Sequence, residues 1–95
     1  MLPCTDGEDQ TVFFVEIQFQ PDPHFYQRLF AEIFLFLRQN PQTVLWQAVV
    51  LFANRRVEPE EPAAFQTLLD SDQVRRIYLE DIQETVPPSL EIGLI

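Results

Sequence analysis

The fold is decided by the stretch Val12-Phe-Phe-Val-Glu-Ile-Gln-Phe-Gln20. Its side chains alternate with a period of two, which is the period of a β-strand. One side of the predicted strand, from about Thr11 to Gln20, carries Glu16, Gln18 and Gln20. The other side is an apolar wall of Phe13, Val15, Ile17 and Phe19. Because same-face neighbours on a strand lie about 6.6 to 6.8 Å apart, the carboxylate and the two carboxamides can address one metal ion, water or phosphate together.

Length and composition bound what the chain can be. It has 95 residues, of which 46% are hydrophobic, and this is enough for one small domain with a packed core. Six arginines, no lysine and fifteen acidic residues give a net charge of −9, which opposes binding to polyanions. A single cysteine and a single histidine exclude an internal disulfide and a zinc site. The sequence has no signal segment and no apolar run of about 20 residues, so a cytoplasmic protein without a membrane partner is predicted.

A long helix is predicted after this strand. Pro21-Asp22-Pro23 ends the strand, with Asp22 as the helix N-cap and Pro23 at the first helical position. The helix is expected to end at about Gln39. Two adjacent apolar stripes cover most of its circumference, namely Phe25, Leu29, Ile33 and Phe36, and Tyr26, Phe30, Phe34 and Leu37. A helix this apolar is normally covered on two sides, so an association surface is expected.

Two further strands and a short helix complete the predicted core. Trp46 to Ala53 is almost continuously apolar, which is typical of a central strand buried on both faces. Ala63 to Asp70 is predicted to be a short helix, and Gln73 to Leu79 a third strand. The intervening loop at residues 58–62 is interpreted as rigid and solvated.

The order β-α-β-α-β predicts an α/β fold with a three-stranded mixed sheet and flanking helices. The sheet would be larger if it paired with another chain. One domain is expected over residues 1–95, with a loop at 1–10, a core at 11–81 and a tail at 82–95.

Glu16 has two interpretations on the residues alone. It can be a ligand of Mg²⁺ or Mn²⁺ in a site that hydrolyses phosphodiesters, with the backbone carbonyl of Ile17 as a second oxygen donor and Gln18 orienting water or phosphate. The alternative, which the spacing alone favours, is an acid on the polar face of an antiparallel edge strand, and a Glu-x-Gln pattern is too short to be specific.

The other polar candidates have plain structural interpretations. His24 is a possible general base, but a histidine in a first helical turn is more often inert. The Arg55-Arg56 and Arg75-Arg76 pairs are predicted to be partners of acidic side chains rather than of phosphates.

A resemblance to a known family covers most of the chain. It is carried by Phe14-Val-Glu-Ile-Gln-Phe-Gln-Pro-Asp-Pro-His-Phe-Tyr-Gln-Arg-Leu-Phe-Ala-Glu-Ile-Phe-Leu-Phe-Leu-Arg-Gln39. It continues in Trp46-Gln-Ala-Val-Val-Leu-Phe52, in Arg56-Val-Glu-Pro59 and in Val74-Arg-Arg-Ile-Tyr-Leu79. These segments closely resemble the Rpn family of recombination-promoting nucleases and transposase-related proteins, a branch of the PD-(D/E)XK nuclease superfamily.

The resemblance implies a metal-dependent DNA endonuclease with a restriction-endonuclease-like core, here a partial one. Glu16 matches the acid of the motif, and Gln18 stands where many superfamily members carry lysine. Gln20 is a possible supporting residue, and Arg28 falls where the family carries a basic residue near the site. On spacing alone, Arg28 is as well explained as a partner of Glu32.

The N-terminal side departs from the family pattern. There, a partner strand with a second metal-binding aspartate and an acid-bearing helix come before the motif, whereas only Met1-Leu-Pro-Cys-Thr5 and an acidic loop stand here. Asp6 and Asp9 in that loop are weak candidate ligands, because acids in turns are usually solvated. The chain is therefore expected to be the C-terminal portion of a longer domain, with weak or no activity as it stands.

Two functions remain open at this stage. The first is an Rpn-like endonuclease that acts on DNA with Mg²⁺ or Mn²⁺. The second is a noncatalytic nuclease remnant that forms homo-oligomers through the edge of the strand at 11–20 or through the apolar helix.

Overall fold

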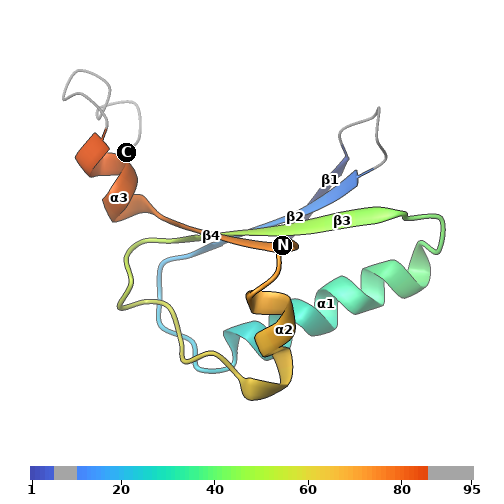
Figure 1. Cartoon of the computed structure of the whole chain (residues 1–95), viewed down its shortest axis with the longest axis horizontal. Coiled ribbons are helices and arrows are strands. Elements are labelled where there is room, and N and C mark those ends of the chain that lie inside the picture. The colour runs from blue at the N-terminus through green and yellow to red at the C-terminus, as the bar shows by residue number, and fades with distance from the viewer. Residues whose placement is uncertain (6–10, 86–95) are drawn as a thin grey trace.

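The computed structural model describes residues 1–5 and 11–85. Its four strands form one sheet in chain order, β1-β2-β3-β4 (Figure 1). β1 is antiparallel to β2, whereas β2, β3 and β4 are mutually parallel. The strands are β1 (Leu2–Thr5), β2 (Thr11–Gln18), β3 (Leu45–Phe52) and β4 (Val74–Tyr78). The predicted α/β class with a mixed sheet and flanking helices is confirmed, with one strand more than the sequence indicated.

The additional strand is β1, in a segment predicted to be loop. Leu2 lies opposite Val15 and Thr5 lies opposite Val12. β2 is therefore an interior strand between β1 and β3, and the prediction that it presents an unpaired edge is wrong. All four side chains of β1 are exposed, so the strand has no buried face that an alternation of apolar and polar residues could have indicated. Pro3 is tolerated because an edge strand needs no N–H donor on its outer side.

Three helices and a 3₁₀ turn complete the described structure. They are α1 (Phe25–Gln39), the turn Ala63–Phe65, α2 (Gln66–Leu69) and α3 (Leu79–Thr85). Figure 1 shows α1 and α2 on the same side of the sheet. α3 lies partly in the segment predicted to be an unpatterned tail, and residues 86–95 lie outside the described part. Within residues 1–5 and 11–85, no helix is long and apolar enough to cross a membrane.

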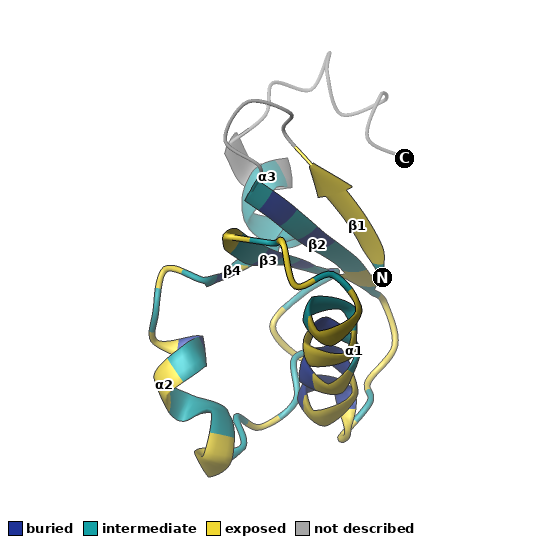
Figure 2. Ribbon diagram, turned by 90° about the vertical axis from the view of Figure 1, so that its right-hand side faces the viewer, coloured by how far each residue is buried: buried dark blue, intermediate teal, exposed yellow. Residues whose placement is uncertain are grey.

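The core lies between the sheet and α1. The buried residues on the inward face of the strands are Val12, Phe14, Ala48, Val50, Phe52 and Val74. α1 contributes Phe25, Tyr26, Leu29, Phe30 and Ile33, and Figure 2 shows this buried side of the helix turned toward the sheet. The aromatic rings of the core pack edge to face: the centroid of the Phe14 ring lies 5.2 Å from that of Phe36 and 6.1 Å from that of Trp46. Such pairs contribute about 0.5 to 1.5 kcal/mol beyond the burial of their area.

Among the residues that the structure describes, nothing comparable covers the opposite face of the sheet. Val49 and Leu51 of β3 are only half-buried there. The prediction that this strand is buried on both faces is therefore wrong, although its central position, between β2 and β4, is confirmed. A continuous apolar run is compatible with burial on either face and does not reveal that only one is covered.

The start of α1 differs slightly from the prediction. The N–H of His24 donates to Asp22 Oδ1 at 2.9 Å, and the helix begins at Phe25, two residues later than expected. Asp22 thus accepts a hydrogen bond in the turn before the helix rather than at its N-cap. The end of the helix at Gln39 is as predicted. α1 is covered by the sheet on one side and by the 3₁₀ turn on another, where Phe65 lies 4.7 Å from Phe30, ring to ring.

Candidate functional site

Glu16 lies on the inward face of β2. It follows Phe14 on that face, and its side chain is 15% exposed. Its carboxylate Oε2 lies 3.0 Å from the α-ammonium group of Met1, whose side chain is equally sheltered. A carboxylate in such a position is stable only with a compensating donor or cation, because burial of an unpaired charge is costly. The position of Glu16 therefore accepts a cation.

Gln18 lies on the same face, and its side chain is hydrogen-bonded to the backbone two residues further along the chain. Its side-chain Nε2 donates to the carbonyl of Gln20 at 2.5 Å, just beyond the end of β2. The side chain of Gln20 is exposed. The side chain of Ile17 points to the opposite face and is 54% exposed, so its backbone carbonyl is the only oxygen donor that this residue offers. Glu16 and Gln18 are thus neighbours, as predicted, and Gln20 contributes through its main chain.

Arg28 pairs with a residue that the sequence interpretation did not consider. Its Nη2 lies 2.7 Å from Asp22 Oδ2, and its guanidinium lies over the ring of Phe25. The pairing with Glu32 that the spacing predicted is wrong, because the turn before α1 brings Asp22 closer. The hydrogen bond from the His24 N–H, followed by that from the Arg28 guanidinium, holds the pKa of Asp22 below its usual value. His24 is exposed at the start of the helix.

No cluster of three or more His, Cys, Asp or Glu side chains able to hold a metal occurs in the part of the chain that the structure describes. Asp6 and Asp9, the candidate second ligands, lie outside the described residues. The oxygen donors near Glu16 are nevertheless of the kind that Mg²⁺ prefers, a carboxylate, a carboxamide and a backbone carbonyl. Mg²⁺ usually keeps several waters and is held by one or two protein carboxylates together with phosphates of the substrate. The residues fit such a partly hydrated ion and not a closed protein cage.

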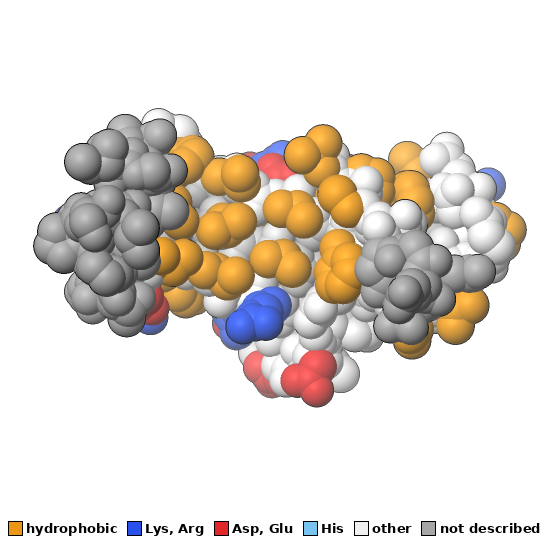
Figure 3. Space-filling model, turned by 90° about the horizontal axis from the view of Figure 1, so that it is seen from above, with side chains coloured by type: hydrophobic (Ala, Val, Ile, Leu, Met, Phe, Trp, Pro, Cys, Tyr) orange, Lys and Arg blue, Asp and Glu red, His pale blue; other side chains and the backbone are white. Residues whose placement is uncertain are grey.

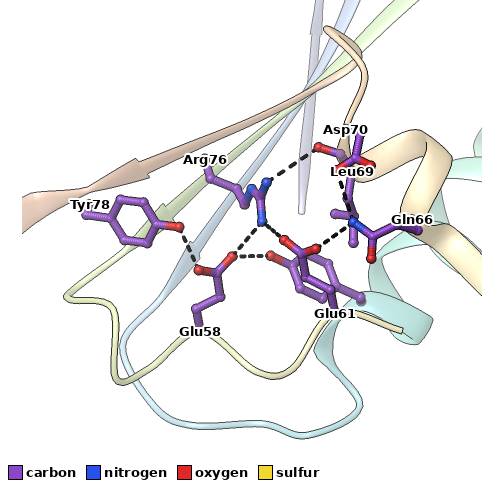
Figure 4. Close-up of polar contacts among 8 residues, drawn as sticks. Glu58, Glu61, Gln66, Leu69, Asp70, Arg76 and Tyr78 are labelled. Atoms are coloured by element: carbon purple, nitrogen blue, oxygen red, sulfur yellow. Dashed lines mark hydrogen bonds and ion pairs between the residues drawn. The ribbon is translucent and has the colours of Figure 1, made fainter. Parts of the chain in front are cut away.

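The most extensive polar network of the described chain was not predicted. Glu58, in the loop interpreted as solvated, is 15% exposed and accepts three hydrogen bonds (Figure 4). Tyr26 of α1 donates at 2.7 Å, Tyr78 of β4 at 2.6 Å, and Arg76 of β4 at 3.1 Å. Arg76 also pairs with Glu61, so both acids of the loop are tied to the sheet. The solvated-loop interpretation is therefore wrong for Glu58 and Glu61.

The network shifts the titration of its members. Burial, followed by the hydrogen bond to Glu58, raises the pKa of Tyr78 to about 12. The same two causes, in the same order, raise the pKa of Tyr26 well above its usual range. Hydrogen bonds from Gln66 and then from Arg76 lower the pKa of Glu61. Burial opposes the charge of Arg76, but its bonds to Glu61 and Glu58 outweigh this and raise its pKa. The network thus favours the protonated forms of both tyrosines and the charged forms of Arg76 and Glu61.

In each of the two arginine pairs, one arginine has the acidic partners that were predicted. Arg55 bonds Glu80 at 3.0 Å and Asp81 at 2.7 Å, and it lies 4.3 Å from the centre of the Tyr78 ring. The hydrogen bond to Asp81 raises the pKa of Arg55 and lowers that of Asp81. Arg55 and Arg76 are therefore partners of acids, as expected. Arg56 and Arg75 form no ion pair with any residue in the described ranges.

A shallow groove of about 280 Å³ lies at the carboxyl ends of β2 and β3. It is bounded by the turn at 21–23 and by the loop at 56–60, and it is lined by neither Glu16 nor Gln18. Ligands of open parallel sheets bind at this end of the strands. The groove lies beyond the end of the strand that carries Glu16, but Glu16 is not among the residues that line it.

Together, these features define a small α/β protein with a mixed four-stranded sheet, α1 and α2 on one face, α3 at the end of β4, and a partly buried acid on an interior strand. A family model described as "Protein of unknown function (DUF2887)" matches residues 1–95. The chain belongs to this family. No significant match was found among curated proteins or among solved structures.

Proposed function

We propose that this chain is an Rpn-like endonuclease domain that hydrolyses DNA phosphodiesters with Mg²⁺ or Mn²⁺, and that Glu16 is its metal ligand. The observation that carries the proposal is the position of Glu16. It is the only acid in the four strands, it faces the covered side of an interior strand, and its carboxylate is compensated by an ammonium group rather than by a side chain. An acid with a purely structural role is more often exposed or paired with another side chain.

The strand order supports the proposal as well. The resemblance implies a partner strand before the Glu-x-Gln strand, and β1, which pairs with β2, precedes it here. It implies a helix after the motif followed by a parallel strand, which corresponds to α1 and β3. β1 itself carries no carboxylate, so it supplies the strand of the family pattern without the second acid.

A bound metal ion would polarise the phosphate and generate hydroxide at neutral pH. The residues of this chain would contribute one carboxylate from Glu16, a carbonyl from Ile17 and an orienting amide from Gln18. Because one carboxylate holds Mg²⁺ weakly, a phosphate of the substrate is needed to complete the shell. We therefore expect binding of the metal and of DNA to depend on each other.

The test is cleavage of supercoiled plasmid DNA with Mg²⁺ or Mn²⁺. Glu16→Gln removes the charge but keeps the shape, and we expect the rate to fall at least about 100-fold, since even loss of a residue that only supports a ligand costs 10- to 100-fold. Glu60→Gln is the matched control, because Glu60 is an exposed acid outside the strands. Circular dichroism of both variants shows whether the fold is kept. Equal cutting by a folded Glu16→Gln variant, or no cutting by the unaltered chain with either metal, would remove the enzymatic proposal.

A second candidate is a noncatalytic module that self-associates. It is favoured by the amount of apolar surface that the described chain leaves open, on α1 and on the sheet. On α1 this surface includes Phe34 and Leu35, which are 45% and 52% exposed. Sedimentation of the chain at micromolar concentration tests this candidate, and a stable monomer would exclude it.

A further inference from the structure

Within residues 1–5 and 11–82, the sheet face opposite α1 and α2 is apolar and open over most of its area, with α3 lying at the end of β4. Along β2 it presents Phe13, Val15 and Ile17, and the pairing of strands extends this row across the sheet. Ile17 lies beside Leu51 of β3, which lies beside Ile77 of β4. Figure 3, viewed onto this side of the sheet, shows hydrophobic side chains gathered across it. Leu2 of β1, opposite Val15, extends the face at its edge and is 67% exposed.

The charge of this face differs from that of the whole chain. The protein carries a net charge of −9, yet Glu16 is the only acid in the four strands and it faces the other side. The single charged residue of the strands on the open face is Arg75, which lies beside Val49. Two copies of an acidic chain repel each other, and the repulsion is weakest where the approaching surfaces carry no carboxylates. Among the described strands, the open face meets this condition.

We propose that two copies of this chain associate through this open sheet face, sheet against sheet. In a two-fold symmetric dimer the same patch of each copy forms the interface, so the apolar row of one copy lies against the apolar row of the other. Sheets pack in this way about 10 Å apart, with strands crossing at about 30°. The single cation per copy makes a nucleic acid a poor occupant, because phosphate binding needs several cations.

The size of the face indicates how strong the association is. Four strands about 4.8 Å apart and four to eight residues long, at about 3.3 Å per residue, give a footprint of roughly 250 to 500 Å². Two such footprints total roughly 500 to 1,000 Å², below the lower limit of about 1,200 Å² for standard interfaces and in the range of weak, transient complexes. We therefore expect a reversible dimer with a dissociation constant in the micromolar range. The proposal does not depend on hydrolysis by Glu16; it gives a surface to the self-association of the second candidate function.

The test is the mass of the chain in solution between about 1 and 200 µM, measured by analytical ultracentrifugation. We expect a shift from 11.2 kDa toward twice that mass as concentration rises. Ile17→Glu buries a charge in the proposed interface, and we expect it to weaken the dimer at least tenfold. Leu35→Glu is the matched control, because Leu35 is 52% exposed and Ile17 54%, but it lies on α1. Ile77→Glu, in the same row on β4, is a second variant in case Ile17→Glu does not fold.

The outcomes separate the possible occupants. A dimer that is weakened by Ile17→Glu or Ile77→Glu and kept in Leu35→Glu supports the proposal. A dimer that only Leu35→Glu dissociates places the contact on α1, which overturns the proposal while keeping self-association. A monomer at all concentrations overturns both. Raising the salt concentration from 0.05 to 0.5 M is expected to tighten the dimer, because salt screens the repulsion between two acidic copies; weakening by salt would instead indicate an interface of ion pairs and contradict the apolar contact.

Discussion

Replacement of Glu58 by glutamine tests whether the polar network holds the loop to the sheet. The carboxylate accepts from Tyr26, Tyr78 and Arg76 in the folded chain. Glutamine keeps the shape but offers one carbonyl oxygen and an amide group. One tyrosine then retains a neutral acceptor, the other faces a donor, and Arg76 keeps only Glu61 as its acidic partner.

The magnitude follows from these contacts. Hydrogen bonds to a charged group contribute about 1.5 to 3 kcal/mol each, and a buried donor left without an acceptor costs about 1 to 3 kcal/mol. Glu58 and Arg76 are 15% and 23% exposed, so water compensates part of this loss. We expect Glu58→Gln to lower the free energy of unfolding by about 2 to 3 kcal/mol. For a domain of this size this corresponds to a fall in the melting temperature of roughly 10 to 20 °C.

Urea unfolding followed by circular dichroism measures the change. Glu60→Gln is the control in the same loop, because Glu60 is exposed, and we expect a change of less than about 0.5 kcal/mol. A double-mutant cycle between Glu58→Gln and Tyr78→Phe should give a coupling free energy above about 0.5 kcal/mol. Equal stability of the Glu58 and Glu60 variants, together with additive effects in the cycle, would refute a stabilising role of the network.

Two further predictions concern the same core. Tyr26 and Tyr78 are the two tyrosines of the chain, and both have raised pKa values, that of Tyr78 about 12. The pKa of a tyrosine in the unfolded chain is about 10. The stability that the protonated tyrosines contribute is therefore complete below about pH 10 and is lost as the pH rises from about 10 through 12. Tyrosinate absorbance at about pH 10 in a folded sample would contradict this. Phe14→Ala, at a fully buried position, should cost about 3 to 5 kcal/mol, whereas Phe19→Ala, at a position 59% exposed, should change stability by less than about 0.5 kcal/mol in the same urea unfolding experiment. Similar losses in the two variants would show that the inward face of β2 is misassigned.

The sequence predicted the strands and helices of this fold better than it predicted which face of each strand is covered. Alternation along β2 correctly grouped Glu16 with Gln18, and the continuous apolar run correctly indicated a central β3. The more apolar row of β2, with Phe13 and Ile17, is nevertheless the open one. The covered face is decided by the side on which α1 crosses, and a period of two along one strand carries no information about that side.

The network around Glu58 had no local signature. Its donors Tyr26, Tyr78 and Arg76 lie 32, 20 and 18 positions away in the sequence. Spacing rules for helices and strands extend over about four residues, so they do not reach such pairs. The general need of a buried tyrosine hydroxyl for a partner was the available hint. The candidate metal ligand, in contrast, was found by motif resemblance, which identified Glu16 and left its cationic neighbour at Met1 unforeseen.

The position of β4 at the edge of the sheet has a consequence for the chain during synthesis. β3, with its continuous apolar segment Leu45–Phe52, is an edge strand until residues 74–78 have been made. Long apolar edge strands template aggregation. In the finished sheet the outer strands carry residues that discourage further pairing, Pro3 in β1 and the two arginines in β4. β4 therefore protects the most aggregation-prone segment of the protein, and a chain that stops before it would expose that segment to its neighbours.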